Sequence, residues 1–272
     1  MTRALIIDTD IGTDVDDALA LVYALKSKAN LKLITTVHGD TKTRARIAKK
    51  ITALMGYEIE VAAGEEKPIS QEKIFWTGIE GKNFVDNSEE IKINPNAVSA
   101  LEKCILANKR NVDIACIGPL TNIAKLLQKN PQLSEFINHL YIMGNATLQQ
   151  HSYSLNYNAH NFKVDPQAAD IVFATSIPKT IVATEVCKKS CLSLEDIETF
   201  KERDCAVMDY LYFAAQDWLN YSSYEQAYLY DPLVLHHCLG GSITEKKEFG
   251  NVSVTTSINK SFREIFLDKL YE

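Results

Sequence analysis

Five aspartates lie within ten positions near the start of the chain, directly after an apolar run. They are Asp8, Asp10, Asp14, Asp16 and Asp17, within the stretch LIIDTDIGTDVDDALAL. The apolar run predicts a strand, Gly12 permits a tight turn, and the ALAL spacing after the last aspartate indicates a helix. We therefore expect all five carboxylates in one small volume at the end of the strand.

A purely structural role accounts for only part of this set. Aspartates near a helix N-terminus gain roughly 0.3–1 kcal/mol from capping and the helix dipole, which explains Asp16 and Asp17 and by extension Asp14. Asp8 and Asp10 precede the turn, and two carboxylates about 4 Å apart repel by roughly 4 kcal/mol at the effective dielectric near a protein surface. Helix capping is too weak to offset this repulsion.

A bound cation is the simplest way to stabilise the cluster. No Lys or Arg stands between Arg3 and Lys26 in the sequence. Because the nearby side chains offer only oxygen ligands, they favour Ca²⁺ or Mg²⁺ over zinc.

The segments that must position this cluster alternate between two apolar patterns. Runs rich in β-branched residues predict strands at residues 4–7, 31–37, 59–63, 112–117, 139–143 and 179–184. Helical spacing predicts helices at residues 16–27, 43–55, 96–108, 121–129, 166–175, 194–201, 205–220 and 232–239. This order indicates an α/β fold with an open, mainly parallel sheet and helices on both faces. Residues 251–270 fit either a strand pair or a strand and a helix.

Open parallel sheets bind ligands beyond the carboxyl ends of their strands, so we expect the site in the loops there. Five such segments are rich in Asp and Asn: TVHGD, IGPLTNIA, YIMGN, AHNFKVDPQAA and YDPL. Asp165 and Asp231 each precede a proline, as helix N-caps do. Thr121 or Asn122 fits a cap of the helix that follows them. Taken together with the five aspartates of residues 8–17, here called the acidic loop, these segments fit a set of metal or substrate ligands better than a set of helix caps.

Composition and charge exclude several classes of protein. A formal charge of −6 without a basic stripe argues against a nucleic-acid partner, because clustered Lys and Arg hold such partners. Residues 2–8 carry one basic residue and a short apolar run, which fits neither a secretory signal nor a membrane span. Six cysteines without CxxC spacing indicate reduced thiols. We expect a cytoplasmic protein without membrane contact, built as a single domain over residues 1–272, that binds small molecules or metal cations.

These motifs, taken in order, resemble those of the inosine-uridine preferring nucleoside hydrolase family. The similar stretches cover nearly the whole chain: DTDIG and DDALAL (residues 8–21), ITTVHG (34–39), VAAG (61–64), GPLTNIA (118–124), MG (143–144), NFKVDPQAA (161–169) and DPL (231–233). The opening signature together with GPLTN is specific. The resemblance implies an open α/β fold that holds one Ca²⁺ and cleaves the N-glycosidic bond of a ribonucleoside to a free base and ribose. It also implies a homodimer or homotetramer.

Carried over position by position, the resemblance implies a role for most of the acidic residues. The Ca²⁺ ligands would be the carboxylates of Asp10, Asp17 and Asp231 and the main-chain carbonyl of Thr121. Asp10 would also act as general base on a water beside the sugar. Asp8 would lie next to the metal ligands and help to hold them in place without binding the ion itself. Asp16 would bind a ribose hydroxyl.

The acidic loop is longer than in the common form of the family. Three residues, TDV, separate Gly12 from the Asp pair, where the common form has one. We align the pair on the alanine that follows it, and the assignment among Asp14, Asp16 and Asp17 stays open.

The half of the predicted site that would bind substrate departs further from the family. Asp40 replaces the usual asparagine after ITTVHG, and Ala159 stands where an acidic residue is common. Tyr230 replaces a histidine, and WTGIEGKNF (residues 76–84) has no histidine where the family has an HG-containing loop. The predicted ribose contacts are Asp16, Asp40, Met143 and Asn161, and the predicted contacts to the base are Tyr230, Trp76 and His160.

Two other functions compete with this interpretation. A phosphatase of the haloacid-dehalogenase type also has DxD after its first strand and binds Mg²⁺, but it favours Thr or Val where Gly12 stands, and it does not predict GPLTNIA or DPL. A metal-holding, catalytically weak protein that binds ribosyl compounds is the other alternative, and the changes at Ala159 and Tyr230 favour it.

Overall fold

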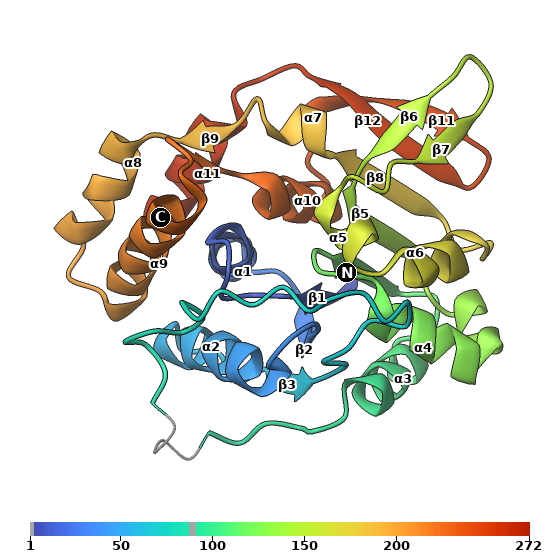
Figure 1. The fold of residues 1–272 in the computed structure, drawn as a ribbon, viewed down its shortest axis with the longest axis horizontal. Helices are drawn as coiled ribbons and strands as arrows, with labels where there is room; N and C mark the ends of the chain where they lie inside the picture. Colours follow the sequence, from blue (N-terminus) through green and yellow to red (C-terminus); the bar gives the residue numbers. More distant parts are fainter. Residues whose placement is uncertain (1–2, 87–90) are drawn as a thin grey trace.

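The computed structural model describes residues 3–86 and 91–272 and centres on an eight-stranded sheet (Figure 1). The strand order is β11-β12-β8-β5-β4-β1-β2-β3. The bounds are β1 Ala4–Thr9, β2 Leu31–Thr36, β3 Glu60–Ala63, β4 Val112–Cys116, β5 His139–Gly144, β8 Lys179–Ala183, β11 Thr244–Phe249 and β12 Val252–Ile258. Neighbouring strands are parallel except for the antiparallel pair β11 and β12. The predicted α/β fold with a mainly parallel sheet is therefore confirmed.

Helices cover both faces of the sheet, so its strands are apolar on both sides. Within β1, Leu5 and Ile7 belong to one buried core, and Ala4 and Ile6 belong to the other. The first core contains α1 Asp16–Lys26, α2 Thr41–Leu54, α9 Ala206–Ser222, α10 Tyr230–Cys238 and α11 Phe262–Tyr271. The second contains α3 Ala97–Ala107, α4 Thr121–Lys129 and α6 Pro166–Phe173. The remaining helices are short: α5 His160–Val164, α7 Thr184–Cys187, α8 Leu194–Glu198, and the 3-10 turns η1 Pro131–Glu135 and η2 Thr199–Glu202.

The C-terminal part resolves one open alternative and adds strands that the pattern does not predict. Residues 251–270 form β12 followed by α11, which is the strand-and-helix alternative. The edge strand β11 alternates too weakly to be predicted. Two small antiparallel pairs are also new: β6 Ala146–Leu148 with β7 Tyr153–Leu155, and β9 Cys191–Leu192 with β10 Ala227–Tyr228. Strands of two or three residues carry too little pattern to detect.

The central strands bring their following loops to one edge of the sheet. β1 lies between β2 and β4, with Asp8 in register with Thr35 and Cys116. The chain then turns at Gly12, whose φ of 116° favours glycine, before it enters α1. None of the helices in the described part of the chain combines the length and apolarity that crossing a bilayer requires.

Candidate active site

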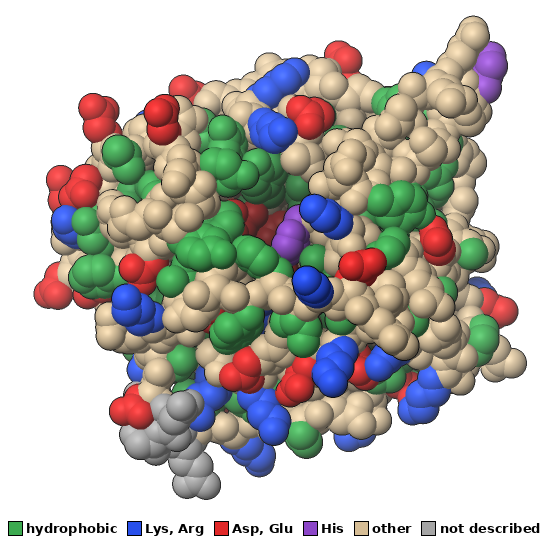
Figure 2. Space-filling view, in the orientation of Figure 1, with side chains coloured by type: hydrophobic (Ala, Val, Ile, Leu, Met, Phe, Trp, Pro, Cys, Tyr) green, Lys and Arg blue, Asp and Glu red, His purple; other side chains and the backbone are tan. Residues whose placement is uncertain are grey.

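A cavity of about 340 Å³ opens at the carboxyl edge of the sheet. Its lining comes from the acidic loop, from the ends of β4 and β5, and from segments around α5, α7, α9 and α10: Asp10, Thr13, Asp14, Asp16, Asp17, Phe75, Ile117, Met143, Gly144, Asn158, Ala159, His160, Asn161, Thr184, Lys188, Trp218, Tyr224, Tyr230 and Asp231. Figure 2 shows this hollow with acidic side chains at its floor and hydrophobic side chains around its mouth. The volume lies within the range of small-molecule sites.

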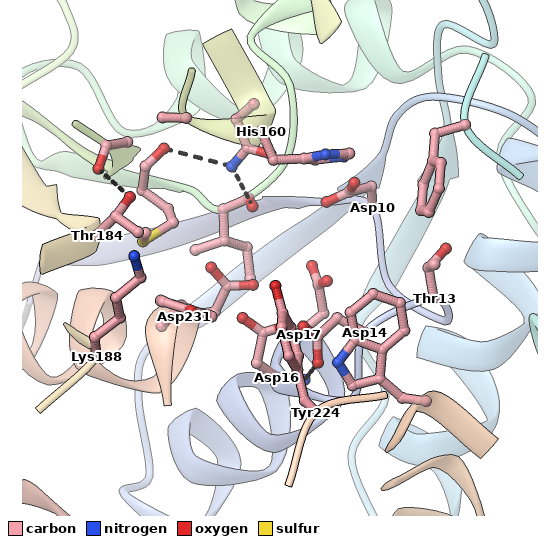
Figure 3. A pocket seen from close by; sticks show the side chains of 18 of the residues that line it. Asp10, Thr13, Asp14, Asp16, Asp17, His160, Thr184, Lys188, Tyr224 and Asp231 are labelled. Atoms are coloured by element: carbon pink, nitrogen blue, oxygen red, sulfur yellow. Dashed lines mark hydrogen bonds between the residues drawn. The ribbon is translucent and has the colours of Figure 1, made fainter. Parts of the chain in front are cut away.

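Three carboxylates converge at the floor of this cavity (Figure 3). Oxygen atoms of Asp16, Asp17 and Asp231 all lie within 4.8 Å of one another, and all three side chains are buried. Burial raises the pKa of each carboxyl group well above its usual range, and the negative charges of its neighbours raise it further. Asp14 is half-buried beside them, and burial raises its pKa to about 8. The loop after β1 and the first turn of α10 thus form one acidic cluster.

The carboxylates at the start of α1 are not used as an N-cap of the helix, so they remain available to a ligand. The N-cap residue of α1 is Val15, and no side chain caps the helix. Asp16 accepts a hydrogen bond from the Asp17 amide at 3.1 Å, and Asp17 accepts one from the Thr9 hydroxyl. Helix capping therefore does not account for the cluster.

Arg44 is the basic side chain beside the acidic loop, and its local sequence gives no sign of this role. It is fully buried on α2. Its guanidinium donates to the carbonyl oxygens of His38 at 2.7 Å, Ile11 at 2.9 Å and Asp10, and to the Thr13 hydroxyl at 3.2 Å. These bonds fix the main chain of the loop, because they go to carbonyl and hydroxyl oxygens rather than to the carboxylates.

Asp8 lies beneath the cavity rather than in its wall. One carboxylate oxygen accepts from the Thr35 hydroxyl at 2.5 Å and from the Asn122 amide at 2.7 Å. The other is buried and has no hydrogen-bond partner among the described residues. Burial raises the pKa of Asp8 to about 7. Within the described part of the chain, this carboxylate thus accepts hydrogen bonds from neutral donors.

The residues at the floor fit a hard divalent cation. They offer carboxylate oxygens and no sulfur or imidazole, in the arrangement that Ca²⁺ and Mg²⁺ prefer. The unpartnered oxygen of Asp8 and the bonds that Arg44 makes to the main chain leave the negative charge of the cluster largely uncompensated. A cation would supply that compensation.

Gly118 lets the GPLTN turn approach Asp10 closely. A Cβ atom at this position would lie 2.8 Å from the Asp10 amide nitrogen and 3.0 Å from an Asp10 carboxylate oxygen. We expect Gly118→Ala to displace Asp10 and to destabilise the fold by about 1–3 kcal/mol, as overpacking does. Urea unfolding and steady-state kinetics measure the two effects. Parental kinetics in a destabilised variant would contradict the view that this contact positions Asp10.

The wall of the cavity contains both polar groups that can bind a sugar hydroxyl and aromatic rings. The Asn161 amide group donates to the carbonyl oxygens of Ile117 at 2.9 Å and Met143 at 3.4 Å, so its own carbonyl oxygen is free to accept a hydrogen bond. His160 packs edge-on against Phe75, with ring centroids 5.5 Å apart. Burial raises the pKa of the Tyr230 phenol above its usual range.

Several lining residues are invisible to sequence reasoning. Phe75, Trp218 and Tyr224 provide much of the aromatic wall, and Lys188 follows α7 at the other side. They lie outside the stretches that resemble the family, and an aromatic residue on an amphipathic helix such as α9 usually marks core packing. Only their position in the fold identifies them.

Two predicted substrate contacts, Asp40 and Trp76, are not among the residues that line the cavity. Asp40 is exposed and caps α2, accepting from the Thr43 amide at 3.1 Å. Trp76 is 38% exposed and covers the Arg44 guanidinium at 5.0 Å. By contrast, the predicted contacts Asp16, Met143, Asn161, Tyr230 and His160 all line the cavity.

Of the predicted helix caps, one is an N-cap in the structure and the others are not. Asp165 caps α6 by accepting from the Ala168 amide at 3.2 Å. Asp231 lies inside the first turn of α10 and points into the cavity, and α4 begins after Leu120 without a side-chain cap. Thr121 is buried at the start of α4, with its hydroxyl donating to Asp165 at 2.7 Å, and it does not line the cavity.

Two solved nucleoside hydrolases share this fold. A plant nucleoside hydrolase, PpNRh1, aligns with a TM-score of 0.81 over 99% of this chain and 98% of its own, at 22% identity. The purine-preferring ribonucleoside hydrolase from Gardnerella vaginalis aligns with a TM-score of 0.76 over 98% and 96%, at 24% identity. At these identities the likeness concerns the fold alone.

Sequence comparison adds the family. The pyrimidine-specific ribonucleoside hydrolase RihA of Salmonella paratyphi B is 34% identical over 212 residues, which cover 74% of this chain and 67% of RihA. The model of the inosine-uridine preferring nucleoside hydrolase family matches residues 5–266, a span that includes every residue of the acidic cluster. The chain therefore belongs to the inosine-uridine preferring nucleoside hydrolases and is an N-glycosyl hydrolase.

Proposed function

We propose that this protein hydrolyses the N-glycosidic bond of a ribonucleoside to a free base and ribose, with Ca²⁺ at the acidic cluster and Asp10 as general base. The observation that carries the proposal is the convergence of Asp16, Asp17 and Asp231 at the floor of a cavity of nucleoside size. The names of the relatives support the reaction class, and the donor set supports the metal.

By the family resemblance, the carboxylates of Asp10, Asp17 and Asp231 and the main-chain carbonyl of Thr121 would hold the ion. Asp17 and Asp231 belong to the converging set and Asp10 lines the same cavity, whereas Thr121 does not line it. Bound there, a hard cation lowers the pKa of a coordinated water and orients the ribose hydroxyls. The family resemblance supports Asp17 as a ligand, and Asp16 would then accept a hydrogen bond from a ribose hydroxyl. Asp14 is half-buried at the cavity wall and is not needed as a ligand.

The protein's own groups then complete the reaction. Asp10 takes a proton from the water that attacks the anomeric carbon. The sugar passes through an oxocarbenium-like state, and the surrounding carboxylates stabilise its positive charge. The free Asn161 carbonyl oxygen binds a second sugar hydroxyl. His160, the histidine that lines the cavity, is placed to protonate a neutral base as it leaves.

A panel of nucleosides tests this proposal directly. Release of reducing sugar from purine and pyrimidine ribonucleosides, lost with a chelator and restored by Ca²⁺, is the expected result. Binding of ribosyl compounds without any release of sugar would instead support the weak binding protein, and release of phosphate from phosphate esters would support the phosphatase.

The affinity for Ca²⁺ should depend on pH. The pKa of Asp8 is raised to about 7 and that of Asp14 to about 8, and burial raises the pKa of Asp16, Asp17 and Asp231 as well. Protons therefore compete with the ion, and we expect the affinity to rise from about pH 6 to about pH 8 with release of protons on binding. Calorimetric titration in buffers of different ionisation enthalpy counts those protons, and an affinity that is flat across this range would contradict the expectation.

The family resemblance also supports a homodimer or homotetramer, which light scattering tests. Cytoplasmic residence is supported by the cysteines, because all six are free thiols.

A further inference from the structure

We propose that the preferred substrates of this site are ribosides whose base carries a positive charge, such as N-ribosylpyridinium compounds and N-alkylated purine ribosides. The inference rests on the proposed function and names its substrate class. Three features of the cavity carry it: an excess of negative charge, an aromatic wall, and a lining poor in groups that protonate a leaving base.

The charge of the cavity favours a cationic ligand. Five carboxylates line it: Asp10, Asp14, Asp16, Asp17 and Asp231. The single lysine in the lining, Lys188, lies 3.3 Å from the Glu185 carboxylate. Figure 3 shows Lys188 beside Thr184, whereas His160 and Thr13 lie on the other side of the acidic cluster. Even with a divalent ion at the floor, the carboxylates outnumber the positive charges.

Aromatic rings from separate segments also line the cavity. Phe75, Trp218 and Tyr224 line the cavity together with His160 and Tyr230. Trp218 contacts Tyr224 edge-on, with centroids 6.2 Å apart, and Tyr224 is 49% exposed, so ring surface remains open to a ligand. Aromatic faces attract cations within about 6 Å of the ring centroid by roughly 0.5–2 kcal/mol. A flat cationic base gains this attraction, and a neutral base of the same shape does not.

The reaction itself is simpler with a cationic base. When the bond between C1′ and the cationic nitrogen breaks, both electrons go to the nitrogen and the base leaves as a neutral molecule. The water oxygen bonds to C1′, and its proton passes through Asp10 to solvent, so one proton is released per turnover. A neutral base must gain a proton or leave as an anion. Besides His160 and the carboxyl groups, the lining offers phenols and an ammonium group, which are weak acids.

Matched pairs of substrates test this inference. Guanosine and 7-methylguanosine differ by one methyl group and one charge, and the neutral and N-methylated forms of nicotinamide are uncleavable probes that differ in the same way. We expect a kcat/KM for 7-methylguanosine at least about tenfold above that for guanosine in the parent protein, from the attraction between the cationic base and the aromatic rings, and a larger ratio when His160 is removed. We also expect the cationic nicotinamide to inhibit about tenfold more tightly than the neutral one. Inhibition by these probes does not depend on the intrinsic lability of cationic ribosides.

Two variants and a control separate binding from proton transfer. Trp218→Leu should remove most of the difference in inhibition between the two nicotinamides, whereas Phe213→Leu, an exposed position on the same helix outside the cavity, should preserve it. His160→Phe keeps a ring and loses the proton donor, so it should lower kcat for guanosine by about a hundredfold and leave 7-methylguanosine nearly unchanged.

The outcomes distinguish the two proposals. Hydrolysis of guanosine at least as efficient as that of 7-methylguanosine, or equal inhibition by the two nicotinamides, would overturn the preference for cationic bases and leave the proposed function standing. No release of sugar from any riboside in the presence of Ca²⁺ would overturn the proposed function itself.

Discussion

Asp10→Asn is expected to lower kcat for any ribonucleoside that the protein cleaves by about 10³-fold or more, with the fold unchanged. The loss of a general base usually accounts for about 10²–10⁴ of the rate. Asparagine has the same shape as aspartate and keeps one carbonyl oxygen for a cation, but it cannot accept a proton at neutral pH. This variant should therefore lose turnover and still bind the ion.

The fold should tolerate the change because Asp10 is held through its main chain. Its carbonyl oxygen accepts a hydrogen bond from Arg44, and its amide packs against Gly118. Within the described part of the chain the carboxylate makes no hydrogen bond, so no folding contact is lost. Steady-state kinetics with saturating Ca²⁺ and thermal unfolding give the two readouts.

Asp268→Asn provides a matched control, since Asp268 is an exposed residue on α11 away from the cavity. It should keep the parental kcat. Parental turnover in Asp10→Asn would remove Asp10 from the mechanism, and the general base would then have to be another carboxylate of the acidic cluster.

The part of the acidic cluster that lies near the start of the chain could be predicted from the sequence because its residues are close together in the chain. A buried strand, a glycine turn and a helix follow one another within residues 4–26, and this order alone carries Asp8 to Asp17 to one edge of the sheet. The alternation of strands and helices was enough to predict a mainly parallel sheet, although not the order of its strands. The edge strand β11 could not, because it is half-exposed and carries charged residues that blur its period.

Residues contributed from distant positions could not be placed in this way. Arg44 stabilises the acidic loop across 33 residues of sequence, and nothing in the α2 pattern shows which main-chain atoms it meets. Asp40 and Asp231 show the ambiguity most clearly. Both follow a predicted strand or loop and both precede a helix, yet Asp40 caps its helix and Asp231 points from within its helix into the cavity. Asp40 lies one residue before its helix begins, whereas Asp231 lies one residue after its helix begins, and this difference of two residues decides between the two roles.

The acidic cluster combines residues from the first and the last parts of the chain. Among the proposed ligands, Asp231 is therefore the one whose loss should most change how much a bound cation stabilises the fold. Asp16 and Asp17 lie in the first turn of α1, whereas Asp231 lies in the first turn of α10, and α10 packs against α1. A cation held between them would therefore fasten α10 to α1. Bound at about a hundred times its dissociation constant, such an ion stabilises the fold by about 2.7 kcal/mol.

Asp231→Ala should lower the affinity for Ca²⁺ by about a hundredfold or more, because the loss of an outer partner of a metal ligand already costs about 10–100-fold. The same variant should be no less stable than the parent when a chelator is present. Its carboxyl group is buried beside Asp16 and Asp17, and its pKa is raised, so near neutral pH its charge destabilises the folded state without an ion. Thermal unfolding with chelator and with Ca²⁺ should thus show a large shift for the parent, a small one for Asp231→Ala, and the parental shift for Asp268→Ala. Equal Ca²⁺ shifts in the parent and in Asp231→Ala would mean that the ion, if it binds, is held by the β1 loop alone.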